Sequence, residues 1–288
     1  MSGKIRFAPS PTGYLHEGHL LSALYVWAAA KKWNLKIHLR IEDHDQSRAR
    51  PAYIAGIRED LAWLGFKYDS ESIQSARGQV YEAALQKLKE KSLVYPCYCS
   101  RKQLLAENPQ SETGEIIYQG KCLHEQRGIP LPHNLRFIVP NKVIDWHDLR
   151  LGDFHENPKL QCGDFPIRDR DNQWTYQFAV CVDDIDEQIT HIVRGEDIRN
   201  STARQIALME ALGRKERAVY LHHPLIVDDN NKKLSKRELA HSLRQDKDAG
   251  ITPEMLFGRV CHKAHLTESD SPITLIDAIS IIMDQIPT

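Results

Sequence analysis

The segment RFAPSPTGYLHEGHL at residues 6–20 constrains the fold most strongly, because its character changes abruptly along its length. Residues 5–8 have the pattern of a short buried strand, and the prolines and glycine that follow prevent regular strand pairing. The next run, LLSALYVWAAAKKW, contains good helix formers and neither glycine nor proline. The sequence therefore predicts a strand, a shaped loop, and a helix that begins near residues 16–18 and ends near Trp33.

The start of this predicted helix has the properties of an anion-binding site. The first backbone N–H groups of a helix have no partner within it, and the helix dipole adds partial positive charge there. His16 and His19 are three positions apart, so they would add two side-chain donors on roughly one face of the first turn. A lone HxxH pattern is more often a pair of exposed histidines in a connection, so other segments must support a binding site.

A second strand and a second helix are predicted next. Residues 35–43, LKIHLRIED, alternate apolar and polar side chains and end in acids. The carboxyl ends of strands are where open α/β sheets hold their ligands, so Glu42 is a candidate binding residue. A helix should then begin at Pro51 and stop at Gly65. Residues 1–66 thus predict an α/β fold with one ligand-binding edge.

Length and charge limit the class of protein. The chain has 288 residues, 41% of them hydrophobic, which suffices for one large core with or without a small appended module. Its net charge of −1 argues against a polybasic coat for nucleic acid, so an RNA contact would need a local patch or a shaped groove. We see no signal-peptide pattern and no apolar run long enough to cross a membrane, and we expect a cytoplasmic protein without a membrane partner.

The six cysteines are expected to be thiols or metal ligands rather than disulfides in that compartment. Cys97 and Cys99 are two positions apart, so on an extended segment both thiols point to one side, and Cys122 could supply a third sulfur. Three sulfur ligands suit zinc, and ligand chemistry alone favours His124 as the fourth ligand. Alternatively these are ordinary reduced cysteines, because CxC is less specific than a paired CxxC motif.

Several segments together resemble the class I aminoacyl-tRNA synthetases, specifically their glutamyl and glutaminyl branch. HEGH at residues 16–19 is similar to the HIGH-type tetrapeptide of that family, with Glu17 where the usual form is apolar. KLSKR at residues 233–237 is similar to the KMSKS-type signature. The resemblance implies that ATP, with magnesium, is bound by His16, Gly18, His19, Lys233, Ser235 and Lys236, and that His16, His19 and Lys236 are catalytic.

The same resemblance implies a pocket for L-glutamate. RIEDHDQSR at residues 40–48 is similar to an RIEDTD-type segment whose first acid binds the amino group of the substrate, and TYQFAVCVDD and VRGED are similar to segments that line the pocket. Glutamate carries two carboxylates and one ammonium group, which match two arginines and one acid; which arginine takes which carboxylate is open. The implied glutamate-binding residues are Arg6, Phe7, Ala8, Pro9, Ser10, Glu42, Tyr176 and Arg194.

Residues 135–200 are expected to return to the main sheet. LRFIVP and residues 143–149 are strand-like, and TYQFAVCVDD at residues 175–184 predicts a strand followed by an acidic turn. A further strand should end at Arg194 and Gly195. Later helices are predicted after a cap at Asn200 or Ser201, around residues 255–265, and around residues 275–283.

Two features resemble the short members of the family, the glutamyl-queuosine tRNA(Asp) synthetases. Those proteins carry a CxC pair followed by YxxxC, which implies one structural zinc ion held here by Cys97, Cys99, Tyr118 and Cys122. Only residues 238–288 follow KLSKR, which leaves little room for the anticodon-binding region of an ordinary glutamyl-tRNA synthetase. The resemblance therefore implies that glutamate is activated without tRNA and transferred to the queuosine base in the anticodon of tRNA(Asp).

Two other functions stay open from the sequence: a minimal glutamyl-tRNA synthetase that charges the 3′ end of tRNA(Glu), and a non-catalytic RNA-binding protein on a synthetase scaffold. We expect a monomer with a Rossmann-type doubly wound parallel sheet, an inserted zinc-containing subdomain similar to an acceptor-end domain, and a short helical C-terminal region. The expected parts are the first half of the catalytic domain at 1–92, the insert at 93–134, the second half with the KLSKR loop at 135–240, and the helical region at 241–288.

Overall fold

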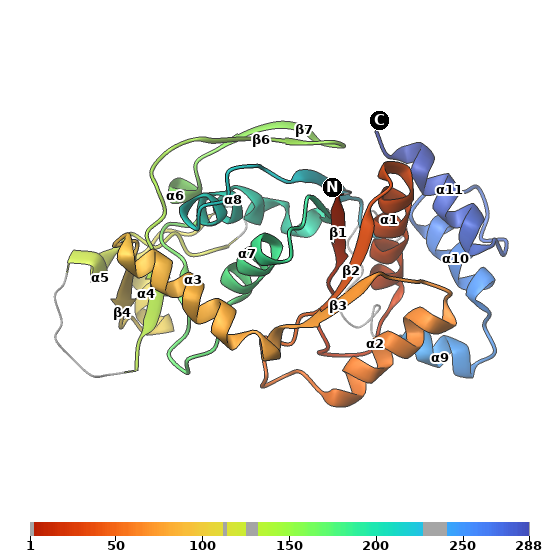
Figure 1. The fold of residues 1–288 in the computed structure, drawn as a ribbon, viewed down its shortest axis with the longest axis horizontal. Helices are drawn as coiled ribbons and strands as arrows, with labels where there is room; N and C mark the ends of the chain where they lie inside the picture. The colour runs from red at the N-terminus through yellow and green to blue at the C-terminus, as the bar shows by residue number, and fades with distance from the viewer. Residues whose placement is uncertain (1–2, 112–113, 125–131, 227–240, 288) are drawn as a thin grey trace.

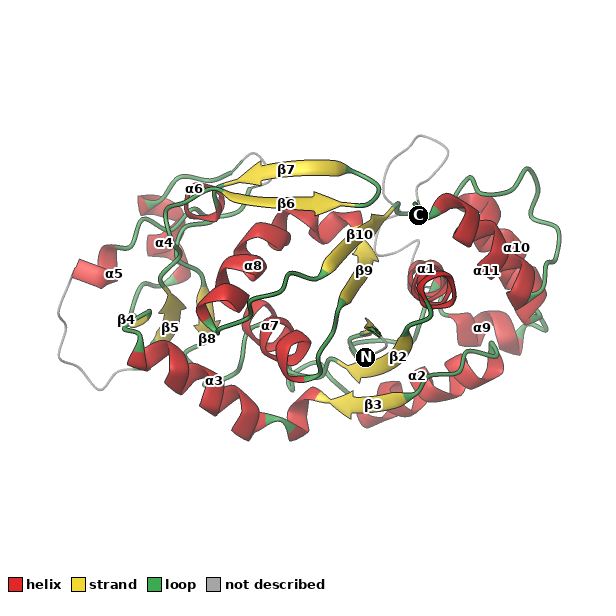
Figure 2. Cartoon of the chain, turned by 45° about the horizontal axis from the view of Figure 1, so that its top comes forward, coloured by secondary structure: helices red, strands yellow, loops and turns green. Residues whose placement is uncertain are grey.

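A seven-stranded sheet runs through the molecule (Figures 1 and 2), in the order β3-β2-β1-β9-β10-β6-β7. Neighbouring strands are parallel except β6 and β7, which form an antiparallel hairpin. The strand order reverses between β1 and β9, which confirms the predicted doubly wound α/β fold. The strands are β1 (Lys4–Phe7), β2 (Lys36–Ile41), β3 (Ser70–Ile73), β6 (Ile144–Asp148), β7 (Gly152–Glu156), β9 (His191–Gly195) and β10 (Val219–His223). This computed structural model describes residues 3–111, 114–124, 132–226 and 241–287.

Two groups of helices lie on opposite sides of β9 and β10 (Figure 2). On one side α1 packs against α10 and α11 in a core that also includes β1 and β2. On the other side α3, α7 and α8 share a second core with β6 and β10. The helices are α1 (Glu17–Trp33), α2 (Pro51–Trp63), α3 (Gly78–Glu90), α7 (Tyr176–Asp186), α8 (Thr202–Ala211), α9 (Leu243–Asp248), α10 (Pro253–Lys263) and α11 (Leu275–Gln285), with short 3₁₀ helices at Gln74–Ala76 and Glu196–Ser201. Within the described ranges, no helix is long and apolar enough to span a bilayer.

The first two helices begin and end where the sequence predicts. α1 is followed by Asn34, whose backbone adopts the left-handed conformation with a φ of 53°. α2 begins at Pro51, whose fixed φ suits the first turn of a helix. Gly65 follows the end of α2 with a φ of 80°, a conformation that strains any residue with a Cβ. These boundaries are local, so short-range sequence signals are enough to find them.

TYQFAVCVDD forms the helix α7, so the predicted strand for this segment is wrong. All the residues from Phe178 to Asp184 are buried. A helix that is buried on every side lacks the polar face that gives a helical period, and its apolar run then has the pattern of a buried strand. The strand that follows, β9, ends at Gly195 as predicted. Ser201 precedes α8 as expected, but its side chain makes no capping hydrogen bond.

A second, antiparallel sheet carries the first of the cysteines, in the order β4 (Val94–Cys97), β5 (Asn134–Phe137) and β8 (Pro166–Arg168). β5 therefore does not return to the main sheet, and that prediction is wrong for residues 135–137. An apolar strand pattern predicts burial but not which sheet the strand joins, because pairing partners lie far apart along the chain. The helices α4 (Arg101–Glu107) and α5 (Lys121–His124) lie beside this sheet in Figure 1, and α6 (Pro158–Gln161) contacts α8.

Candidate active site

The two histidines of HEGH close the N-terminus of α1. The backbone N–H of Gly18 donates to His16 Nδ1 at 3.1 Å, and the backbone N–H of His16 donates to His19 Nδ1 at 3.2 Å. Each Nδ1 acts as an acceptor and carries no proton, so Nε2 is the protonated nitrogen of each neutral ring. The ring centroids are 3.9 Å apart. The helix start thus combines two imidazole N–H donors with the positive end of its dipole.

Both histidines are neutral near pH 7. Burial lowers the pKa of His16, although the charge of Glu17 acts to raise it. Burial and the neighbouring His16 hold the pKa of His19 well below its usual value. Protonation of Nδ1 would also break the capping hydrogen bond that this atom accepts in each ring. These groups can therefore donate hydrogen bonds to an anion without carrying a charge of their own.

A cavity of about 150 Å³ lies where the strand order reverses, at the carboxyl ends of β1 and β9. Doubly wound sheets bind their ligands at this point. Ser10 lines a neighbouring cavity instead. The structure brings the other expected glutamate-binding residues together around the smaller cavity, whose lining includes Arg6, Phe7, Ala8, Pro9, Glu42, Tyr176 and Arg194.

Arg194 has only neutral hydrogen-bond partners in the part of the chain that the structure describes. Its Nε donates to His222 Nε2 at 3.0 Å. Its terminal nitrogens donate to Gln205 Oε1 at 2.7 Å and to Thr202 Oγ1 at 2.9 Å. The residue is 5% exposed, and a buried guanidinium without a carboxylate partner is costly unless a ligand supplies one. This geometry suits an anionic ligand in the cavity.

Arg6, the other arginine of this cavity, already has an acidic partner. Its Nε donates to Asp184 Oδ1 at 3.1 Å, and its Nη1 donates to the Val193 carbonyl at 3.3 Å. Asp184 also accepts a hydrogen bond from Arg40 at 2.7 Å. The charge of Arg6 is therefore compensated in part within the protein. A ligand carboxylate gains more electrostatic stabilisation from Arg194.

Glu42 supplies negative charge to the same cavity from the carboxyl end of β2. One of its oxygens lies 3.7 Å from Arg40 Nη1, and the residue is 5% exposed. Burial raises its pKa to about 7, while Arg40 and Arg6 act to lower it. A bound ammonium group would favour the ionised form further. The cavity therefore offers both signs of charge to one small molecule.

A larger cavity of about 780 Å³ opens at the N-terminus of α1. His19 lines both cavities, so they meet at that side chain. The volume of the larger cavity lies within the range of about 300–1,000 Å³ that is usual for small-molecule sites. Lys233, Ser235 and Lys236 belong to residues 227–240 and lie outside the described residues. The lining consists of Ser10, Thr12, Gly13, Tyr14, His16 and His19 with Arg48, Tyr53, Ser242, Arg244, Gln245 and Asp248.

Glu17 points to the C-terminal helices and not to either cavity lining. Its carboxylate lies 2.8 Å from Arg259 Nε and 2.6 Å from Lys263 Nζ, both on α10. An apolar residue at this position could not form these ion pairs. The departure of HEGH from the usual tetrapeptide therefore adds a contact between α1 and α10 while both histidines keep their places.

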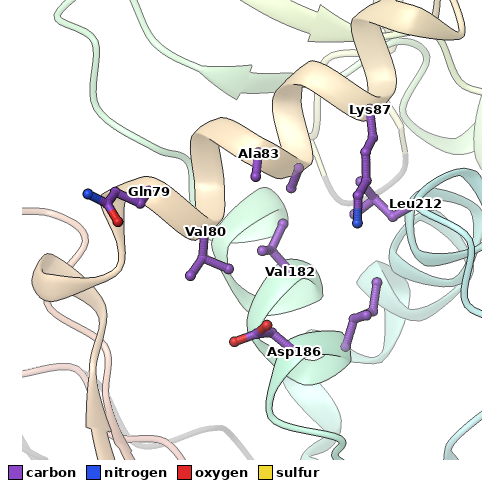
Figure 3. Close-up of a pocket in the computed structure, with 9 residues that line it drawn as sticks. Gln79, Val80, Ala83, Lys87, Val182, Asp186 and Leu212 are labelled. Atoms are coloured by element: carbon purple, nitrogen blue, oxygen red, sulfur yellow. The ribbon is translucent and has the colours of Figure 1, made fainter.

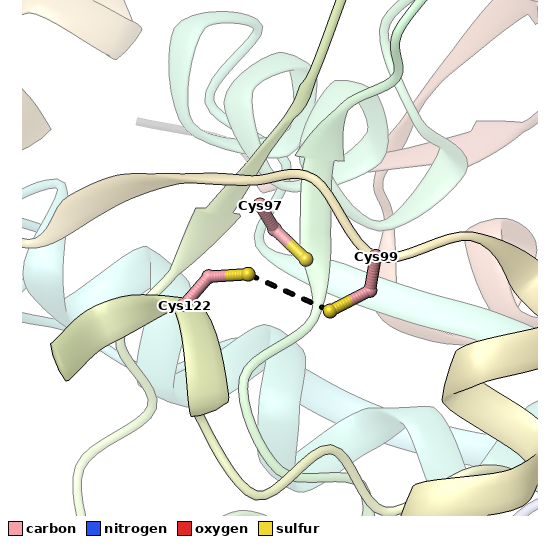
Figure 4. Close-up of side chains that lie close together, drawn as sticks. All are labelled: Cys97, Cys99 and Cys122. Atoms are coloured by element: carbon pink, nitrogen blue, oxygen red, sulfur yellow. Dashed lines mark hydrogen bonds between the residues drawn. The ribbon is translucent and has the colours of Figure 1, made fainter. Parts of the chain in front are cut away.

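Cys97, Cys99 and Cys122 form a buried cluster beside the second sheet, and Figure 4 shows their sulfurs pointing toward one another. All three sulfurs lie within 4.8 Å of one another, and those of Cys99 and Cys122 are 3.5 Å apart. Tetrahedral zinc with Zn–S bonds of about 2.3 Å requires sulfur separations of about 3.8 Å. The thiol positions therefore fit a zinc ion closely.

Tyr118, and not His124, completes this cluster. The Tyr118 hydroxyl lies 3.5 Å from Cys97 Sγ and 3.7 Å from Cys99 Sγ, and it accepts the backbone N–H of Cys122 at 2.9 Å. His124 is exposed and has no place in the metal-ligand group found among the described residues. Of the two candidates for a fourth ligand, Tyr118 is the one whose side-chain oxygen lies beside the sulfurs.

A further cavity of about 360 Å³ lies between α3 and α7 (Figure 3). Its lining is largely apolar, with Lys87 and Asp186 at the edge. It contains none of the residues that the sequence singles out. Nothing in its lining resembles a reactive site.

The sequence reasoning missed the polar residues that surround Arg194. Thr202 and Gln205 lie on α8, and His222 lies on β10, next to Arg194 in the sheet register. A signal for His222 was present, because LHHPL at residues 221–225 contains two adjacent histidines just before a proline. The residues that α9 contributes to the larger cavity had no such signal.

Comparison with known proteins shows the family of this chain. Residues 4–281 match the model of the family described as tRNA synthetases class I (E and Q), catalytic domain. The chain is 38% identical over 276 residues to the glutamyl-Q tRNA(Asp) synthetase of Neisseria meningitidis serogroup C, covering 94% of this chain and 92% of that protein. It is also 38% identical over 270 residues to the glutamate–tRNA ligase of Aquifex aeolicus, covering 90% of this chain. It spans 56% of that ligase's length.

A solved structure supports the same assignment. The crystal structure of the glutamate–tRNA synthetase from Elizabethkingia anophelis matches with a TM-score of 0.79 at 26% sequence identity. The match covers 97% of this chain and 65% of that one. The family model, the relatives and the fold agree, and the chain belongs to the class I tRNA synthetases of the glutamate and glutamine group, through their catalytic domain.

Proposed function

We propose that the protein uses Mg·ATP to activate L-glutamate as glutamyl-adenylate, without tRNA, and transfers the glutamate to the queuosine base in the anticodon of tRNA(Asp). The observation that carries the proposal is the meeting of two cavities at His19, a small one with charges of both signs and a larger one at a helix N-terminus. The similarity to a glutamyl-Q tRNA(Asp) synthetase over 92% of that protein supports the tRNA substrate. The cytoplasmic location and the monomeric state stay predictions.

In this proposal the smaller cavity orients glutamate by charge. Arg194 binds one carboxylate, because it is the arginine of this cavity lining that has no acidic partner among the described residues. Glu42 receives the ammonium group. Arg6 and Tyr176 fill the remaining polar positions of the wall, and the reacting carboxylate is directed toward His19 and the larger cavity.

The proposed reaction joins the two cavities. A carboxylate oxygen of glutamate attacks the α-phosphorus of ATP, the bond from that phosphorus to the bridging oxygen breaks, and pyrophosphate leaves. The nucleophile is already ionised near neutral pH, so no general base is needed. Catalysis then consists of alignment and of stabilising charge on the phosphoryl oxygens, by His16, His19, the positive end of the α1 dipole, and Lys233, Ser235 and Lys236. Magnesium bound with ATP would neutralise part of the phosphate charge.

We further propose that Cys97, Cys99, Tyr118 and Cys122 hold one structural zinc ion. Zinc would add folding free energy to a segment that buries little apolar surface of its own. The site lies on the second sheet, away from both cavities, so zinc has no part in adenylate formation. Its role would be to shape the surface that meets the RNA.

Two assays test the proposed function. Glutamate-dependent exchange of labelled pyrophosphate into ATP, without tRNA, tests activation. Incubation with labelled glutamate, ATP and total tRNA, followed by location of the label, tests transfer. Label on queuosine-bearing tRNA(Asp) but not on tRNA(Asp) without queuosine is the expected result. Label on the 3′ end of tRNA(Glu) would instead identify a minimal glutamyl-tRNA synthetase, and no exchange at all would leave only a binding protein.

The substitution Lys236→Ala is expected to slow pyrophosphate exchange by about 3–4 kcal/mol of lost transition-state stabilisation, by comparison with the loss of a preorganised donor. Lys232→Ala removes a neighbouring lysine outside KLSKR and is the matched control. We expect the control to exchange at close to the parent rate. Exchange by Lys236→Ala at the parent rate would refute the role of this lysine.

The pH dependence of glutamate binding should follow Glu42. Its pKa of about 7 in the free protein means that the ionised fraction falls as the pH drops below 7, so kcat/KM for glutamate in the exchange assay should fall from pH 8 to pH 6. His19 stays neutral over that range because burial lowers its pKa to about 3, and burial also lowers the pKa of His16. Glu42→Gln should react more slowly at pH 8 and lose most of this pH dependence. An unchanged profile in Glu42→Gln would exclude Glu42 as its source.

A further inference from the structure

We propose that Asp148 and His222 are positioning residues that hold the guanidinium of Arg194 in the orientation needed to bind a carboxylate of the substrate. The inference rests on the proposed function and extends it. Asp148 and His222 lie outside the cavity lining, and they would fix the orientation of Arg194, which belongs to that lining. The three side chains come from adjacent strands of the main sheet, β6, β10 and β9.

The contacts form a continuous chain from the hairpin to the cavity. His222 Nδ1 lies 2.7 Å from Asp148 Oδ2, and His222 Nε2 accepts from Arg194 Nε at 3.0 Å. Asp148 and His222 are both fully buried, at 0% exposure. His222 and Arg194 are also direct register partners across β10 and β9. No rotation of the ring is needed to connect the acid with the arginine.

Asp148 determines which nitrogen of His222 carries the proton. A carboxylate accepts only, so Nδ1 is protonated and donates to it. In the neutral ring Nε2 is then unprotonated and can accept from Arg194. With the opposite tautomer, two N–H groups would face each other across this contact and Arg194 would lose an acceptor.

Asp148 itself is fixed by the backbone. Its Oδ1 accepts the N–H groups of Arg150 and Leu151, each at 3.0 Å, and its Oδ2 accepts the N–H of His222 at 3.0 Å. These bonds tie the acid to the turn after β6 and to β10. The Asp148 side chain therefore has little freedom to move, and this rigidity passes to His222 and Arg194.

The hydrogen bonds of Arg194 use three of its five N–H groups and leave two available for a ligand. Nε and one N–H of each terminal nitrogen are used by His222, Gln205 and Thr202. One N–H on each terminal nitrogen has no partner among the described residues, and these groups can donate to the oxygens of a carboxylate. Without His222, only Gln205 and Thr202 would hold the guanidinium, and its orientation toward the cavity would be less fixed.

The test compares three variants in the pyrophosphate exchange assay. His222→Leu removes the acceptor, and we expect KM for glutamate to rise about 10- to 100-fold while KM for ATP stays within about twofold. His222→Gln offers an amide oxygen near the position of Nε2 and should recover much of the glutamate affinity. His191→Leu is the matched control, because His191 lies on β9 at the opposite end from Arg194 and should behave as the parent protein.

A substitution of Asp148 tests the same contacts at a second residue, and thermal unfolding controls for a general loss of folding. Asp148→Asn keeps one oxygen for the turn but presents an amide N–H to His222, which favours the wrong tautomer, so it should raise KM for glutamate as His222→Leu does. Thermal unfolding of all variants is measured beside the assay. The inference is overturned if folded His222→Leu and Asp148→Asn keep the parent KM for glutamate, or if KM for ATP rises equally. Absence of exchange in the parent protein would instead refute the proposed function.

Discussion

Substitution of Cys99 by serine is expected to abolish zinc binding and to unfold the segment around the cysteine cluster. In small zinc domains, structural zinc contributes an apparent binding free energy of about 10–16 kcal/mol at neutral pH, and that energy is folding energy. Here Cys99 Sγ lies 3.5 Å from Cys122 Sγ and 3.7 Å from the Tyr118 hydroxyl. The substitution therefore removes one of the proposed zinc ligands from the cluster. Metal content by mass spectrometry under native conditions and thermal unfolding measure the effect.

Two control variants separate this metal site from ordinary buried cysteines. Cys261→Ala removes a buried thiol from α10, far from the cluster in sequence, and should leave one zinc per chain. Tyr118→Phe should weaken zinc retention against a chelator, whereas His124→Ala should not.

The structure locates both cavities outside the cluster, so Cys99→Ser should still catalyse glutamate-dependent exchange while transfer to tRNA falls. Full zinc content in Cys99→Ser would contradict the assignment.

The substitution Arg194→Met should separate binding from stability. Truncation of a buried, hydrogen-bonded charge that faces an opposite charge costs about 2–5 kcal/mol of binding, so we expect KM for glutamate to rise by about 30- to 5,000-fold. The unfolding free energy without ligand should change little, because the partners of Arg194 are neutral groups and the substitution removes a buried charge. Urea denaturation and pyrophosphate exchange provide the two measurements.

Arg40→Met is the contrasting variant for this experiment. Arg40 is fully buried and lies 2.7 Å from Asp184 and 2.6 Å from Glu187. Its removal takes one cation away from a buried cluster of acids, and breaking a buried ion pair in this way costs about 3–5 kcal/mol of stability. We therefore expect Arg40→Met to unfold at a much lower urea concentration than Arg194→Met. Equal destabilisation by the two substitutions would show that Arg194 is a structural residue and not a ligand-binding one.

The order of strands and helices in the first part of the chain could be predicted because each boundary has a local cause. A proline begins α2, a glycine follows it, and the apolar run of α1 lacks both residue types. The histidines of HEGH were found for the same reason, since they belong to the helix start itself. Their use of Nδ1 to cap the helix could not be predicted, because it depends on the orientation of each ring.

The segment of α7 shows where local reasoning fails. Its start, TYQFAVCV, is rich in aromatic and β-branched residues that are typical of a strand, but in the fold the segment packs as a helix against α3 and α8. β5 was predicted as a strand, but pairing with β4 and β8 puts it in the second sheet. Both errors concern contacts between residues that are distant in sequence.

The sequence by itself determined which chemical groups are present and the local elements that carry them: a strand, loop and helix with two histidines, an acid at the end of β2, and cysteines at ligand spacing. Only the tertiary structure decided how the charges are shared. Asp184 already pairs with Arg6, whereas Arg194 is held by neutral groups from α8 and β10. The reason is physical, since a local pattern reflects forces between near neighbours, whereas the charge available to a ligand depends on every group that folding brings within reach.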